Sequence, residues 1–407
     1  MERLLAREDV AAACRLLAQD DERTLREQVE LTEIPAPSFH EGPRGDRVAT
    51  LLRDAGARQV TKDEVGNVLA RMGPDEGAPF IVSAHLDTVF PAGTNVTVSE
   101  RNGRYVGPGI SDDARGLAAL LALARALDHE TVPLAGPLLL AATVGEEGAG
   151  DLRGCRHLFR SNGPGASARG FISLDGAGIS RIVSRAIGAR RLRAVVRGPG
   201  GHSWVDFGMP NPIHALGAAV EAVARIPLPD APASTATVAR WGGGRSINAI
   251  PAEAWIELDL RSEGGTVLSD IESRTRESLA AAVRRSNQGA RARQGTLSLE
   301  VTVVGDRPAG RTLDDSLLVT AALAATRALG REPELVASST DANVPMSLGI
   351  PAVTMGAGGE AGKAHTQQEW YTNTGGSNGI VRALLTILLV VGVGETAPQA
   401  PLPSTSE

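Results

Sequence analysis

The stretch FIVSAHLDTVFP, residues 80–91, joins an apolar run to two polar side chains. Phe80, Ile81 and Val82 predict a buried strand, and His85 and Asp87 follow it closely. Residues two apart in a strand project from the same face, so His85 and Asp87 should point together at its carboxyl end. A neutral imidazole can bind zinc with a carboxylate orienting it, and a hydrogen-bonded pair without metal explains the same residues.

The rest of the chain places this strand in an α/β domain. Strands are expected in NVLARM, PLLLAATVGEE and GFISLD, with a helix beginning at Ala114 between the first two. Such alternation predicts a mixed, mostly parallel sheet with helices on both faces. From about Gly188 the pattern changes to period two in RRLRAVVRG, AWIELDLRS and TLSLEVTVVG, which is typical of a sheet with one buried face.

The change of pattern predicts two domains. With helices expected near 211–226 and 267–286, residues 187–308 form an α+β unit inserted between 1–186 and 309–395. The final segment, 396–407, is rich in proline and serine and is expected to be disordered. A length of 407 residues agrees with two hydrophobic cores.

The composition excludes several classes of partner. A net charge of -6 gives no reason to expect nucleic acid or an anionic membrane. The two cysteines, Cys14 and Cys155, have no metal-binding spacing, which favours a reducing cytoplasm. No window is apolar enough to predict a membrane span.

Four further motifs carry acids or histidine. Asp112 and Asp113 follow the turn GPGIS, where an aspartate could instead only cap the helix that follows. Glu146 and Glu147 lie between glycines after an apolar strand. Two more residues complete the set: Asp175, which closes the strand GFISL, and His365, which follows the loop GAGGEAG.

Together these residues predict a metal site. The carboxyl ends of strands in an open α/β sheet meet at the edge where such domains place their sites. Two histidines, three carboxylates and one spare glutamate are the ligands of a two-zinc site with one shared carboxylate. Adjacent glutamates repel each other and raise one pKa, which suits a general base.

The same residues give the chain a family resemblance. It resembles the co-catalytic zinc metallopeptidases that include aminoacylase, glutamate carboxypeptidase, succinyl-diaminopimelate desuccinylase and peptidase T. The resemblance runs from LTEIPAPSFHEG through DEVGNVLA to AHTQQEW, and the inserted unit lies where that family has its lid domain. An aspartate at 175, where other branches have glutamate, favours the branch of peptidase T and tripeptide aminopeptidases.

The resemblance implies a role for each catalytic-domain residue. Glu146 would be the general base, and Asp87 would hold the imidazole of His85. The motif phase favours Asp112 over Asp113 as the bridging ligand, which the family often follows with a cis peptide. The implied metal ligands are His85, Asp112, Glu147, Asp175 and His365.

The resemblance also implies roles in the lid. His202 would polarise the scissile carbonyl, often in the active site of a second subunit, which implies a homodimer through the lid. Asn248 and Arg261 would hold a substrate carboxylate, although a surface ion pair also explains the arginine. The segment 339–345, STDANVP, resembles a family loop near the site.

The function implied is metal-dependent hydrolysis of an amide bond in small peptides or N-acyl amino acids. Aminopeptidase, dipeptidase, carboxypeptidase and aminoacylase activities remain open, and the two ions could be zinc, cobalt or manganese. A non-catalytic descendant that only binds metal is a remote alternative, because no ligand and no base is missing. A nucleotide-binding oxidoreductase is disfavoured because GPGISDDARG places acids where a pyrophosphate would bind.

Overall fold

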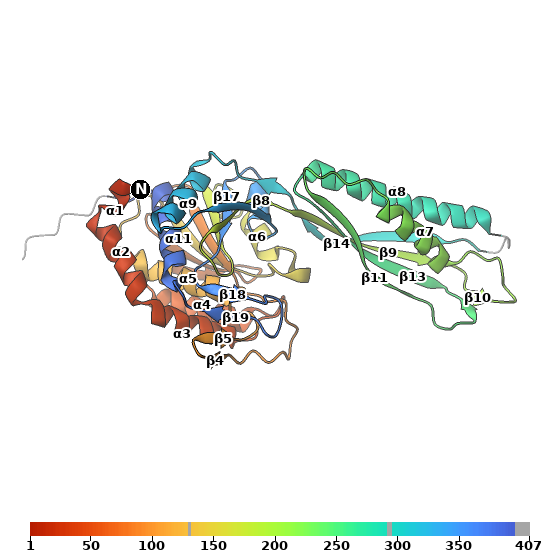
Figure 1. The fold of residues 1–407 in the computed structure, drawn as a ribbon, viewed down its shortest axis with the longest axis horizontal. Coiled ribbons are helices and arrows are strands. Elements are labelled where there is room, and N and C mark those ends of the chain that lie inside the picture. The colour runs from red at the N-terminus through yellow and green to blue at the C-terminus, as the bar shows by residue number, and fades with distance from the viewer. Residues whose placement is uncertain (129–131, 291–294, 395–407) are drawn as a thin grey trace, which may run out of the picture.

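A computed structural model describes residues 1–128, 132–290 and 295–394. Figure 1 shows a rounded domain that contains the amino-terminal helices and a long, narrow domain that extends from it. The segment 396–407, for which disorder is expected, lies outside the described residues.

The rounded domain is built on a nine-stranded mixed sheet. Its order is β1-β2-β6-β3-β7-β17-β8-β15, with β16 also paired to β8. The four central strands are parallel: β6 (Leu138–Thr143), β3 (Phe80–His85), β7 (Gly170–Leu174) and β17 (Ala352–Met355). Strands added on either side include antiparallel pairs: β1 (Arg58–Lys62), β2 (Val68–Met72), β8 (Arg181–Ala186), β15 (Gly310–Arg311) and β16 (Glu334–Ser338).

Both faces of this sheet are covered, which explains the uninterrupted apolar runs of its central strands. Along β3, Phe80 and Val82 pack into the larger core, whereas Ile81 packs into a smaller core on the opposite face. Helices contribute to both cores: α1 (Glu2–Leu5), α2 (Glu8–Gln19), α3 (Asp21–Thr32), α4 (Gly42–Asp54), α5 (Ala114–Ala126), α9 (Leu317–Ala328) and α11 (Gly376–Val391) contribute to the larger, and α6 (Arg153–Leu158) and α10 (Asn343–Ser347) to the smaller.

The inserted domain has its own sheet and core. Its order is β11-β13-β9-β14, all antiparallel, and helices α7 (Pro212–Ala224) and α8 (Gly265–Gly289) pack against it. In β13 (Glu253–Ser262) buried and less buried residues alternate, as period two requires. The other strands are β9 (Gly188–Arg197), β11 (Ser234–Gly243), β14 (Ser298–Arg307) and the short pair β10 (Gly201–His202) and β12 (Ala249–Ile250).

The α/β fold with an inserted lid is therefore confirmed. A small antiparallel sheet completes the rounded domain, from β4 (Ser99–Arg101), β5 (Arg104–Val106), β18 (Glu360–Gly362) and β19 (Trp370–Thr372). A short 3-10 turn, η1 (Gly148–Gly150), follows Glu147. Among the described residues, no helix is long and apolar enough to cross a membrane.

Candidate metal centre

The metal-ligand candidates gather where the parallel strands end. His85 is the last residue of β3 and lies opposite Thr143, the last residue of β6. Glu147 follows β6 by four residues, and Asp175 directly follows β7. Because β3 is parallel to both β6 and β7, these side chains meet at one edge of the sheet.

Asp112 lies at the middle of this group. One of its carboxylate oxygens is 2.9 Å from Nε2 of His85, and the other is 3.0 Å from Nε2 of His365. His365 Nε2 is also 3.0 Å from a carboxylate oxygen of Glu147. Two groups of three possible ligands therefore share Asp112, and the donor atoms in each lie within 4.8 Å of one another: His85, Asp112 and Asp175 in one, and Asp112, Glu147 and His365 in the other.

The neighbouring Asp113 has a different environment. It is fully buried, and its carboxylate accepts the backbone N–H of His85 at 2.9 Å and that of Gly116 at 2.9 Å. Gly116 is required there, because a Cβ atom would lie 2.3 Å from the Asp113 carboxylate and 2.4 Å from the Leu174 carbonyl. Asp113 thus caps helix α5, while Asp112 points to the two histidines. The peptide bond between the two aspartates is cis, which agrees with the expectation from the family resemblance.

His85 and Asp87 do meet, through a different contact from the one expected. Nδ1 of His85 lies 2.9 Å from the backbone carbonyl of Asp87 and 3.6 Å from its carboxylate. With Nδ1 donating to the carbonyl, Nε2 presents its lone pair toward Asp112. The Asp87 carboxylate instead accepts the N–H groups of Glu146 and Glu147, at 2.9 and 3.0 Å, and the Ser38 hydroxyl at 2.7 Å.

Glu146 lies beside the two ligand groups and is 5% exposed. Its carboxylate, His85 and Glu147 form a third group of closely spaced donors. Arg307 donates from Nη1 to Glu146 Oε1 at 3.0 Å. Burial raises the pKa of Glu146 well above its ordinary value, which Arg307 opposes and Glu147 reinforces.

Two residues that support the metal centre were not identified from the sequence. Arg307 is one, and Glu369 is the other. The fully buried Glu369 carboxylate accepts the N–H groups of Gly109, Ser111 and Asp112 at 2.8 to 3.0 Å. It thereby fixes the loop that carries Asp112. The only sequence signal for Glu369 is its position in the AHTQQEW motif, four residues after His365.

The lid borders the centre with arginines. A cavity of about 440 Å³ is lined by Asp112, both glutamates and His365 from the rounded domain, and by Arg191, Arg261 and Arg307 from the lid. Arg261 and Arg307 both lie opposite Ala189 on neighbouring strands, so all three arginines belong to one face of the lid sheet. Arg261 is therefore near the metal centre, with its Nε 2.7 Å from Asp259.

His202 and Asn248 lie at the opposite end of the lid. His202 belongs to β10, which pairs with β12 next to Asn248, and Figure 1 shows β10 far from the rounded domain. From Glu253 to Arg261 the strand β13 alone spans about 26 Å, at about 3.3 Å per residue. Within one chain, Asn248 and Arg261 are therefore not neighbours.

The electrostatics of the ligand groups reflect crowded acids. Burial would lower the pKa of His85, but its contacts with Asp112 and Asp87 raise it well above the ordinary value. Burial would raise the pKa of Asp112, but His365 and His85 hold it below its ordinary value. Burial, Asp112 and Asp113 raise the pKa of Asp175 well above its ordinary range. This crowding favours the binding of cations.

The donor chemistry fits two divalent ions. Imidazole nitrogens and carboxylate oxygens are ordinary zinc ligands, and each three-donor group supplies one imidazole and two carboxylates. When ionised, Glu146 and the three ligand acids would carry four negative charges, which two divalent cations would balance.

Comparison with known proteins defines the class. Residues 81–387 match Peptidase family M20/M25/M40, and the chain belongs to that family of metallopeptidases and amidohydrolases. The resemblance seen in the sequence is thereby confirmed.

Solved structures extend the match beyond this segment. The aminopeptidase PepT from Bacillus cereus ATCC 10987 is 25% identical, with 91% of this chain and 98% of that chain covered and a TM-score of 0.74. A tripeptidase from Staphylococcus aureus subsp. aureus Mu50 is 22% identical over 91% and 98%, also with a TM-score of 0.74. A dinuclear metal-binding M20 peptidase from Bacillus subtilis is 16% identical over 92% and 99%, with a TM-score of 0.65.

Proposed function

We propose that this protein hydrolyses an amide bond in small peptides, using two divalent metal ions, zinc in the native enzyme. His85 and Asp175 would hold one ion, Glu147 and His365 the other, and Asp112 would bridge them. The observation that carries the proposal is the Asp112 carboxylate, whose two oxygens face two different histidines at 2.9 and 3.0 Å. The dinuclear B. subtilis relative supports the same number of ions.

The metal ions and the residues around their ligands would have different roles in amide hydrolysis. Bound divalent ions supply Lewis acidity, which lowers the pKa of water and polarises a carbonyl group. Glu146 takes the proton of the attacking water and passes it to the leaving amine, as its position beside both ligand groups allows. Asp87 keeps Glu146 and Glu147 in place through their backbone N–H groups.

Arginines of the lid favour a substrate with a free carboxylate. Arg261 lines the cavity together with Arg191, and a guanidinium binds a carboxylate through two parallel hydrogen bonds. A cavity of about 440 Å³ suits a short peptide. Similarity to the aminopeptidase PepT from B. cereus favours an aminopeptidase, and the likeness to the S. aureus tripeptidase agrees with tripeptides as substrates. An N-acyl amino acid also has a free carboxylate and is the alternative substrate.

His202 would act in the active site of a second copy of the chain. Its Nδ1 accepts the Trp204 N–H at 3.2 Å, so the proton lies on Nε2, which can donate to a developing oxyanion. Rotation of the lid about residues 187 and 308 leaves the distance from this hinge to β10 unchanged. Because the metal centre lies beside the hinge, such a rotation would not bring His202 to the centre of its own chain.

Exposed apolar residues surround this end of the lid. Trp204, Val205, Phe207 and Ile247 are 73% to 103% exposed, and they flank His202 and Asn248 in the sequence. A second chain that covers them would form a dimer and complete both sites.

The proposal is tested with metal analysis and a substrate panel. The purified protein should contain a divalent metal and cleave free tripeptides faster than dipeptides or N-acyl amino acids. Chelation should abolish the activity, and Glu146→Ala should lower kcat at least about a thousandfold while the metal is retained. Glu76→Ala, which removes an exposed glutamate, is the matched control. A Glu146→Ala enzyme with the activity of the unsubstituted protein would refute the mechanism.

A further inference from the structure

Arg307 occupies the point where the lid returns to the catalytic domain. It is the last residue of β14, and it is 5% exposed. The chain enters the lid near Ile187 and leaves it near Pro308, and these two segments form the hinge. One amide group holds both, since Nδ2 of Asn343 donates to the carbonyls of Ile187 and Pro308 at 2.9 Å each. Asn343 belongs to the STDANVP segment, whose role the proposed chemistry does not explain.

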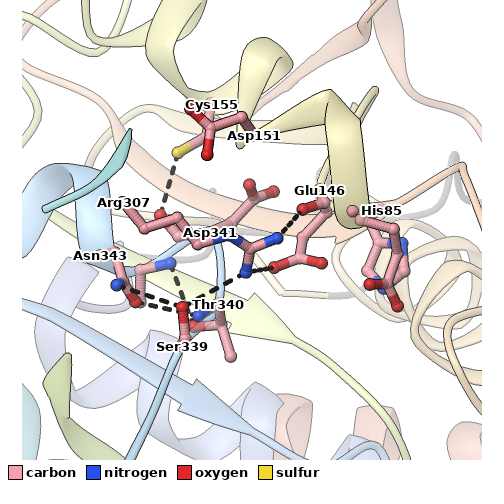
Figure 2. Close-up of polar contacts among 12 residues, drawn as sticks. His85, Glu146, Asp151, Cys155, Arg307, Ser339, Thr340, Asp341 and Asn343 are labelled. Carbon is pink, nitrogen blue, oxygen red and sulfur yellow. Dashed lines mark hydrogen bonds and ion pairs between the residues drawn. The ribbon is translucent and has the colours of Figure 1, made fainter. Parts of the chain in front are cut away.

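The guanidinium of Arg307 contacts Glu146 at two places. Nη1 donates to the carboxylate oxygen Oε1 at 3.0 Å, and Nη2 donates to the backbone carbonyl of the same residue. Nη1 also lies 3.3 Å from the Ser339 hydroxyl. Figure 2 shows these contacts, with the second carboxylate oxygen of Glu146 directed away from Arg307 toward the side where His85 lies.

A contact to both the backbone and the side chain of one residue restricts its rotamer. A glutamate has three side-chain torsions, and fixing one carboxylate oxygen relative to the backbone leaves few combinations of them. The free oxygen is then held beside the ligand groups before a substrate binds. General-base catalysis depends on such placement within hydrogen-bond reach of the proton.

The end of β14 makes a second contact with the loop that carries Glu146. The N–H of Asp306 donates to both carboxylate oxygens of Asp151, at 3.1 and 3.0 Å. Residues 146–151 are thus tied to the hinge at both ends, by Arg307 and by Asp306. A movement of the lid about its hinge would therefore be transmitted to this loop.

We propose that Arg307 is a positioning residue that fixes the carboxylate of Glu146 and links its placement to the lid hinge. The inference rests on the proposed role of Glu146 as general base. It assigns a task to Asn343, which binds both hinge crossings, and to Ser339, whose hydroxyl accepts from the Nη1 of Arg307. Arg307 binds Glu146 with both terminal nitrogens. Its role thus differs from that proposed for Arg261, which would bind the carboxylate of the substrate.

The test uses kcat and KM of Arg307→Ala and Arg307→Lys in the full-length, metal-loaded protein. The alanine variant should lose about a hundredfold in kcat, with KM changed less than about threefold and metal content unchanged. The lysine variant keeps the charge but cannot make both contacts, so it should lose about tenfold. Guanidinium ion added to the alanine variant should restore part of kcat.

Two further measurements separate positioning from general stability. In a Glu146→Ala background, adding Arg307→Ala should change the residual rate by less than about twofold, since the group that Arg307 positions is gone. A crystal structure of metal-loaded Arg307→Lys should show the Glu146 carboxylate in a different rotamer and the metal ligands unmoved. Arg156→Ala is the control, because Arg156 also contacts the hinge, at the carbonyl of Asp306, without touching Glu146.

The outcomes distinguish this inference from the proposed function. If Glu146→Ala abolishes activity but Arg307→Lys and Arg307→Ala retain kcat, the role of Arg307 is refuted and the base remains. A raised KM with unchanged kcat would make Arg307 a substrate ligand instead. If the alanine variant does not fold, the lysine variant decides, and an unchanged kcat with an unchanged Glu146 rotamer overturns the proposal. Full activity of Glu146→Ala would remove the function on which the inference rests.

Discussion

The metal-binding edge of the catalytic domain and the far end of the lid each carry candidate catalytic histidines, and the two regions differ in completeness. At the edge, His85 and Glu146 are buried, and contacts within one chain join four of the ligand candidates: His85, Asp112, Glu147 and His365. At the far end, His202 is exposed beside Trp204, which is 85% exposed. A buried site is prearranged by its own fold, whereas an exposed apolar one gains its environment from a partner.

The largest effect is expected at the metal-binding edge, where substitutions of two adjacent aspartates should have different consequences. Asp112→Ala should lose bound metal and at least about a thousandfold in activity, or about 4 kcal/mol of transition-state stabilisation, while the fold is retained. Asp113→Asn should instead destabilise the protein by about 1–3 kcal/mol, because its carboxylate serves buried backbone N–H groups. Metal analysis and urea unfolding of both variants check this, and equal metal loss in both would contradict it.

The second test asks whether the far end works in another chain. His202→Ala should lower kcat about a hundredfold, the usual cost of removing an oxyanion donor, with metal retained. Mixed with Glu146→Ala under conditions that exchange subunits, it should recover about one quarter of the normal rate, because half of the dimers would have one intact site.

The subunit-mixing experiment could also contradict the proposed role of His202. A monomeric protein in light scattering, with no recovery on mixing, would show that the lid end does not supply His202 to a second chain. Trp204→Ser is the control for the interface, since it removes exposed apolar surface without touching the histidine ring, and it should weaken the dimer.

A smaller effect is expected for Asp87, which supports the edge without being a ligand. Asp87→Asn should weaken metal binding and lower activity about tenfold to a hundredfold, the usual cost of disturbing groups that orient metal ligands. Its carboxylate holds Glu146 and Glu147 through their N–H groups, so both base and ligand should be displaced. Ser38→Ala removes one donor to Asp87 and should have a milder effect. Metal titration and kcat measure both, and an unchanged metal affinity in Asp87→Asn would contradict the role.

The comparison also shows which features the sequence could predict. The α/β fold and the inserted lid follow from local periodicity, because an apolar run such as Phe80–Val82 signals a strand buried on both faces. Candidate ligands could be located because each follows a strand end or a glycine turn. Deciding between Asp112 and Asp113 needs the backbone, since both lie in the same turn and only one caps α5.

Other features depend on contacts that no local pattern reveals. Arg307 reaches Glu146 across 161 residues of sequence, and Glu369 reaches Ser111 across 258. The separation of Asn248 from Arg261 is set by the length and register of β13, which the thirteen-residue spacing alone does not disclose. Long-range packing, and not residue type, determines these positions.

The last expected effect is on stability and not on activity, and it concerns Asp341, a buried acid of the STDANVP segment that lies outside the ligand groups. Its carboxylate accepts the Thr143 hydroxyl at 2.6 Å, and burial raises its pKa from 3.8 to about 6. Because the folded protein holds this proton more tightly than the unfolded chain, its contribution to stability is complete below about pH 4 and is lost as the pH rises through about 6. The shift corresponds to at most about 3 kcal/mol.

Asp341→Asn should remove this pH dependence, since an amide does not titrate there and can still accept from Thr143. The variant should be more stable than the unsubstituted protein at pH 8 and closer to it at pH 5, while metal content stays the same. Urea unfolding at these two pH values measures the difference, with Asp230→Asn, an exposed aspartate of the lid, as control. If the variant and the unsubstituted protein differ by the same free energy of unfolding at both pH values, Asp341 is ionised at both. The buried edge would then hold the charge of Asp341 in addition to the charges of the ligand groups.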